Sequence, residues 1–158
     1  MASATTRGLL IAAAVFGGVL AGGNIDRALV AMPAWERVGT QGWAEFSRYA
    51  DLGNGLFLYP IEAIGGALLV LAAAISFHFD RTAPPQAAVP LYGAVVLVLA
   101  GLALTLKAAP IMLGIRDMSD PAGLQASFEG FRFWGNLRGA CQVTTFLLEV
   151  WALGVLPR

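Results

Sequence analysis

Apolar residues fall in four long blocks along the chain, and more polar segments separate these blocks. A helix needs about 20 mostly apolar residues to cross the hydrocarbon core of a membrane. The blocks therefore predict four transmembrane helices, at about residues 8–32, 53–79, 86–115 and 132–156, with Pro33 ending the first. We expect an all-α integral membrane protein in which residues 1–158 form a single domain, an up-down-up-down bundle of four transmembrane helices.

The composition supports a membrane protein and excludes several other classes. Hydrophobic residues make up 58% of the chain and charged residues 13%, whereas soluble domains average about 45–50% and about 25%. Ten basic and ten acidic residues balance, so we expect no nucleic acid partner. A single cysteine, Cys141, and a single histidine, His78, supply too few ligands for a metal site. We expect the protein to reside in a bacterial cell membrane, in contact with membrane lipid. The sequence does not determine its orientation in the membrane or whether it forms a homo-oligomer.

The polar residues of the predicted helices gather on one side of the membrane. Successive helices alternate in direction. The C-terminal ends of the first and third helices therefore lie on the same side of the membrane as the N-terminal ends of the second and fourth. These parts carry Asn24, Asp26, Arg27, Tyr59, Glu62, Lys107, Trp134, Asn136 and Arg138. Ionisable groups within a membrane are costly and often mark functional sites. We therefore expect a pocket that opens on one side, rather than a pore.

Two helical faces narrow the candidates further. Tyr59 and Glu62 lie three residues apart and share one face. In the last helix one face carries a series of polar residues spaced by four, three and four positions: Arg138, Gln142, Thr145 and Glu149. This stripe is either the polar wall of a cavity or a structural contact between helices, in which Arg138 pairs with Glu62.

The pattern favours acid–base chemistry on an aromatic ligand. A buried carboxylate such as Glu62 is suited to abstract a carbon-bound or phenolic proton, and a cation such as Arg138 can hold the resulting oxyanion. The candidate catalytic residues are Glu62, Arg138, Lys107 and Asp26. The candidate substrate-binding residues are Asn24, Arg27, Trp35, Tyr59, Trp134, Asn136, Gln142, Thr145 and Glu149. Pairing of Asp26 with Arg27, and extension of Lys107 towards the headgroups, remain alternative interpretations.

Several short motifs resemble one known family. They are the glycine-rich end of the first helix (GGVLAGGNIDRALVAMPAW, 17–35), Tyr59-Pro60, Pro110, and FWGNLRG (133–139). Together they look like the anthrone oxygenase-like membrane proteins, formerly a domain of unknown function. The resemblance implies oxidation of anthrones to anthraquinones with dioxygen as co-substrate and no cofactor. Met32-Pro33 stands where many relatives carry His-Pro, so a role for that histidine does not carry over.

We therefore expect a cofactor-independent membrane oxygenase, a monooxygenase, that acts on a lipophilic aromatic or polyketide-type substrate. One alternative is a non-redox cyclase, isomerase or epoxide-opening enzyme that uses the same pocket with Glu62 as the acid. Another alternative is a non-catalytic assembly partner or a small transporter.

Overall fold

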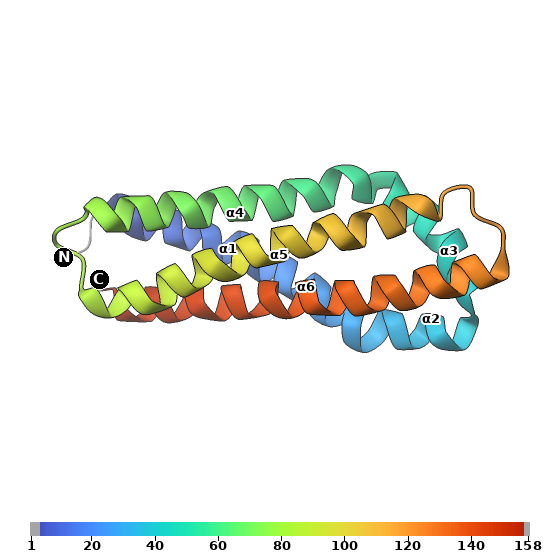
Figure 1. Cartoon of the computed structure of the whole chain (residues 1–158). Coiled ribbons are helices and arrows are strands. Elements are labelled where there is room, and N and C mark those ends of the chain that lie inside the picture. The colour runs from blue at the N-terminus through green and yellow to red at the C-terminus, as the bar shows by residue number, and fades with distance from the viewer. Residues whose placement is uncertain (1–3, 157–158) are drawn as a thin grey trace.

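Four long helices lie alongside one another and account for most of the chain (Figure 1). The computed structural model describes residues 4–156, and within this range it contains helices and no strand. The long helices are α1 (Ala4–Asp26), α4 (Gly55–Phe79), α5 (Ala88–Gly114) and α6 (Pro121–Val155). The shorter elements are the π-helical turn η1 (Arg27–Ala31), α2 (Met32–Val38), α3 (Thr40–Tyr49), the π-helical turn η2 (Ala50–Asn54) and the 3₁₀ turn η3 (Pro85–Ala87).

Three segments of the structure are long and apolar enough to cross a membrane. They are Ala4–Val38, Thr40–Phe79 and Pro85–Gly114. Helix α6, which contains the fourth predicted span, is not among them, because Arg138, Gln142 and Glu149 lower its mean hydropathy. The observed α4 and α5 coincide within two residues with the helices predicted at 53–79 and 86–115.

Two predicted helix ends were wrong. The first helix does not end before Pro33, because helical backbone continues through η1 and α2 to Val38. Pro33 lies in the first turn of α2, where its missing N–H removes no hydrogen bond of α2. The last helix begins at Pro121 rather than at 132. Its start is capped by Asp120, whose carboxylate accepts a hydrogen bond of 2.7 Å from the Gly123 amide.

Small and apolar side chains fill the interior at the end where α1 begins and α6 ends. Leu10, Ala73, Leu91 and Ala152 are fully buried there, and the cluster that they form includes Leu156 near the end of the described chain. Alanine and glycine let the helix backbones approach closely, which is the usual packing mode of helices in membranes.

The outer surfaces of the long helices are apolar. Large hydrophobic side chains are exposed on all four: Val15, Val19, Phe57, Leu68, Ile75, Val96, Leu106, Leu147 and Trp151. Contiguous exposed apolar surface of this kind marks a face that contacts lipid or another protein.

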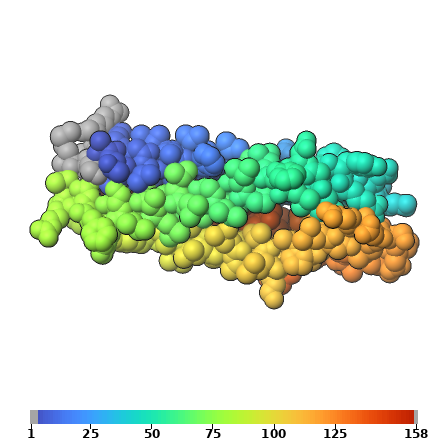
Figure 2. All heavy atoms as spheres, turned by 90° about the horizontal axis from the view of Figure 1, so that it is seen from above, coloured from blue at the N-terminus to red at the C-terminus, as the bar shows by residue number. Residues whose placement is uncertain are grey.

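At the opposite end, the short helix α3 packs against α6, and α2 contacts α3 (Figure 1). Trp43 of α3 is buried, and its ring centroid lies 5.2 Å from that of Phe128. Between these two ends, part of α6 (red) is visible in an opening between α4 (green) and α5 (yellow to orange) in Figure 2. The polar interior described next lies on α6 and on the helices that face it.

Candidate functional site

A buried ion pair joins the two π-helical turns. Arg27 is the first residue of η1 and Asp51 lies in η2, and Arg27 Nη2 lies 2.5 Å from Asp51 Oδ1. The Asp51 side chain is only 7% exposed, so the guanidinium of Arg27 compensates its charge inside the protein. Arg27 Nη2 also donates a hydrogen bond of 3.2 Å to the Tyr59 hydroxyl.

Aromatic rings complete the surroundings of Arg27. The centre of its guanidinium lies 5.4 Å from the Tyr59 ring centroid and 5.5 Å from that of Phe131. These distances are typical of cation–π contacts. The ion pair, the hydroxyl and the two rings therefore hold Arg27 in one position. We call Arg27, Asp51 and Tyr59 the arginine cluster.

Arg138 lies within electrostatic reach of the arginine cluster but is not part of its hydrogen bonds. The charges of Arg27 and Asp51 both act on Arg138. The Nε atom of Arg138 is buried and has no hydrogen-bond partner among the described residues. Arg138 does not pair with Glu62, the alternative considered above. The ion pairs among residues 4–156 are Arg27–Asp51 and Arg132–Glu36.

A second polar contact lies between α1 and α6. Asn24 Nδ2 donates to Gln142 Oε1 over 2.7 Å and to the backbone oxygen of Leu20 over 2.6 Å. Gly139 lies against this asparagine, because a Cβ at that position would come within 3.2 Å of Asn24 Oδ1. At Gln142 the polar stripe makes a structural contact, because this side chain joins α6 to α1.

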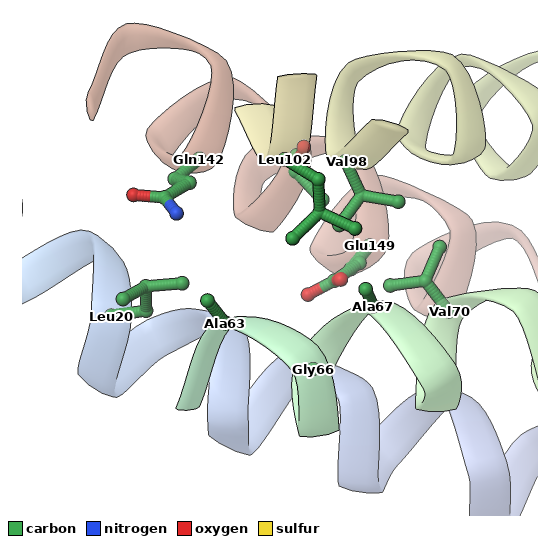
Figure 3. Close-up of a pocket in the computed structure, with 11 residues that line it drawn as sticks. Leu20, Ala63, Gly66, Ala67, Val70, Val98, Leu102, Gln142 and Glu149 are labelled. Atoms are coloured by element: carbon green, nitrogen blue, oxygen red, sulfur yellow. The ribbon is translucent and has the colours of Figure 1, made fainter. Parts of the chain in front are cut away.

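A cavity between the long helices is lined by three residues of the stripe, Gln142, Thr145 and Glu149, and not by Arg138 (Figure 3). The cavity is narrow: the volume open to the centre of a water molecule is about 20 Å³, room for roughly one water. Helices α1, α4 and α5 contribute mostly small or apolar residues: Gly17, Leu20, Ala63, Gly66, Ala67, Val70, Val98 and Leu102. Helix α6 contributes Gln142, Thr145 and Glu149. In Figure 3 the side chain of Gln142 lies above Leu20, and the carboxylate of Glu149 lies further along, between Ala63 and Ala67.

Glu149 is the deepest ionisable group of the cavity. Its side chain is 1% exposed, and its Oε2 atom has no hydrogen-bond partner among the described residues. Thr145, one turn earlier, is 4% exposed and donates to the backbone oxygen of Cys141 over 2.8 Å. The buried face predicted for the last helix is thus present from Gln142 to Glu149.

The remaining candidates lie outside this interior. Glu62 is half-buried on α4, and its charge acts on Tyr59. Trp35 and Trp134 are partly buried and pack against the apolar cluster beneath α3. Three candidates are exposed on the surface: Asp26, Lys107 and Asn136. The structure therefore joins Arg27 to Tyr59 near Arg138, and separately joins Asn24 to Gln142. It leaves Asp26, Lys107 and Asn136 outside both groups.

Two residues of the site are not among those predicted from the sequence. Asp51 lies between the first and second predicted helices, as the last carboxylate before the second and on the same side as Arg27. Gly17 was assigned to a glycine-rich motif, although a Cβ there would come within 2.5 Å of Glu149 Oε2. The position of Asp51 was a usable signal, whereas the partner of Gly17 lies far along the chain and has no local signature.

The described residues contain no group of three or more His, Cys, Asp or Glu side chains that could hold a metal ion. No family model, no curated protein and no solved structure matches the chain.

Proposed function

We propose that the chain crosses the membrane four times as an up-down-up-down bundle, with α6 as the fourth span. Its 35 residues correspond to about 50 Å of helix, more than the roughly 30 Å of a hydrocarbon core. The polar residues Gln142, Thr145 and Glu149 are buried, whereas Leu147 and Trp151 are exposed. Polar side chains on the inner face and apolar ones on the outer face suit a helix that crosses lipid within a bundle.

Within this bundle we propose a pocket that binds the oxygen atom of a lipophilic aromatic molecule. The observation that carries this proposal is the buried and unpartnered Nε of Arg138 beside the arginine cluster. A buried donor without a partner costs about 1–3 kcal/mol, and a ligand oxygen would supply the missing acceptor. Tyr59, which is 41% exposed, offers an aromatic face at the edge of the same region.

The reaction we propose is cofactor-independent oxidation of an anthrone-type substrate. Glu62, one turn from Tyr59 on α4, accepts a proton from the ring CH₂ group, and Arg138 stabilises the enolate oxygen that forms. Dioxygen then reacts with the electron-rich ring carbon. The CH₂ group becomes a carbonyl, and the second oxygen atom leaves as water with the two hydrogens. The resemblance in the motifs of residues 17–35 and 133–139 supports this choice of substrate.

This proposal can be tested with an anthrone as the probe and membranes that contain the full chain. We expect dioxygen uptake together with the absorbance of an anthraquinone. Glu62→Gln and Arg138→Leu should each lower the rate about 100-fold or more, the usual contribution of a general base or an oxyanion partner. Asp117→Asn and Arg116→Leu, which change exposed groups between α5 and α6, are the matched controls.

Two outcomes would contradict the proposal. Wild-type membranes that consume no dioxygen with the probe would exclude oxidation of an anthrone. Full rates in both the Glu62 and the Arg138 variants would remove the roles proposed for these residues. Conversion of the probe without dioxygen would instead support the non-redox alternative.

A further inference from the structure

Glu149 lies apart from the region in which we propose oxidation. It follows Arg138 by roughly 16 Å of helix rise on α6. The other cavity-lining residues on α1, α4, α5 and α6 carry no titratable side chain. The nearest titratable groups along the surrounding helices are Asp26 on α1, Glu62 on α4, Tyr92 and Lys107 on α5, and Arg138 and Cys141 on α6. None of them lines the cavity. The carboxyl group therefore faces a space without any other ionisable group.

The packing of α1 keeps this carboxyl group in place. Gly17 lies directly against it, since a Cβ at Gly17 would approach Oε2 within 2.5 Å, the carboxyl carbon within 3.4 Å and Oε1 within 3.5 Å. Any larger residue would force the carboxyl group to move. In contrast, Gly22 on the same helix has nothing within 4 Å of an added Cβ, so no contact requires glycine at position 22.

The surroundings determine how the charge of Glu149 can be neutralised. A buried carboxylate without a partner is very costly, and no ion pair involves Glu149 in the described part of the chain. A hard metal cation takes about six oxygen ligands. The polar oxygens on the cavity wall belong to Glu149, Thr145 and Gln142, and Gln142 Oε1 already accepts from Asn24. A proton needs no further ligand.

We propose that Glu149 is a proton-binding site inside the bundle and that it shares its proton with a water molecule in the cavity. Thr145 precedes Glu149 by one turn on the same face of α6, and both line the cavity. A water molecule between them accepts from the protonated carboxyl of Glu149 and donates to the Thr145 hydroxyl oxygen. A buried water needs two to four such polar partners. Proton exchange between the carboxyl and this water makes the binding reversible.

This proposal does not depend on the proposed oxidation and has a separate test. The full chain in phosphatidylcholine vesicles is treated with a lipophilic carbodiimide, which reacts with protonated carboxyl groups inside membranes. Mass spectrometry should find Glu149 modified, with less modification as the pH rises. A water-soluble carbodiimide should modify exposed Glu36 and Glu45 and spare Glu149.

Two variants of α1 sharpen the test. Gly17→Ala should reduce the modification of Glu149 several-fold, because the added Cβ displaces the carboxyl group. Gly22→Ala should behave like the wild type. Infrared spectra of the wild type should show a protonated-acid C=O band that disappears in Glu149→Gln.

The opposite results would overturn the proposal. Glu149 that stays unmodified at every pH in the wild type is not a proton-binding site. Modification that sodium ions suppress would show a carboxylate that binds a cation. Both results come from the unaltered chain, so a variant that fails to fold cannot obscure them.

Discussion

Arg27 and Asp51 show how burial changes the contribution of an ion pair to protein stability. Their side chains are 27% and 7% exposed, whereas those of the other ion pair, Arg132 and Glu36, are 41% and 61% exposed. In an exposed pair, water already stabilises both charges, so each partner loses little when the other is removed. Removal of one member of a buried pair leaves an uncompensated charge in a medium that solvates it poorly.

We therefore expect Arg27→Ala to destabilise the protein by about 3–5 kcal/mol, the usual result of breaking a buried pair. Arg132→Ala should change stability by at most about 1 kcal/mol, as is typical of exposed pairs. Thermal unfolding in detergent can compare the two variants. In the double variant Arg27→Ala/Asp51→Ala, part of the lost stability should return, because no unpaired charge remains. Equal destabilisation by Arg27→Ala and Arg132→Ala would contradict this account.

At the scale of elements, α3 is attached to the connection between α5 and α6. One face of α3 is buried through Trp43, Ala44 and Ser47, which anchors the helix. Arg48 extends from this anchor and donates a hydrogen bond of 3.1 Å from Nε to the Ile115 oxygen, and another from Nη2 to the Met118 oxygen. Both carbonyls lie in the connection after α5, where the Ile115 oxygen also accepts a hydrogen bond of 3.3 Å from the Met118 amide. Arg48 therefore fixes this connection to α3.

Arg48→Ala should consequently loosen residues 115–118. Hydrogen bonds from charged groups contribute about 1.5–3 kcal/mol, so we expect amide exchange in this connection to accelerate about tenfold or more. Hydrogen–deuterium exchange followed by mass spectrometry measures this directly. Arg37→Ala, at an exposed position of α2, should leave the exchange unchanged. If Arg48→Ala also leaves it unchanged, the attachment depends on the apolar face of α3 alone.

At the scale of the whole molecule, the sequence was informative where a signal repeats locally. Apolar blocks and helical spacing predicted α4, α5 and the buried stripe of α6. The start of α6 was missed because Asp120 and Pro121 lie in a polar segment, and a helix there depends on capping and on packing against α3. The pair Arg27–Asp51 joins two turns that are 24 residues apart. Such contacts depend on how helices pack, which periodicity does not encode.

The number of membrane crossings is a property of the whole molecule that three single cysteines can decide. In a Cys141→Ala background, we would place a cysteine at one of three exposed positions: Gln86 before α5, Ser119 before α6, or Gly154 near the end of α6. Ala87 and Leu156 belong to one apolar cluster, so positions 86 and 154 should lie on the same side of the membrane.

A membrane-impermeant thiol reagent applied to intact cells should therefore give the cysteines at 86 and 154 the same response, and the cysteine at 119 the opposite one. Permeabilised cells, in which all three should react, are the control. If the cysteine at position 154 responds in the same way as the one at position 119, α6 does not cross the membrane. Its buried residues Gln142, Thr145 and Glu149 then do not face the centre of a membrane bundle. Opposite responses of 119 and 154 would place the polar stripe across the membrane, since those positions flank it on one continuous helix.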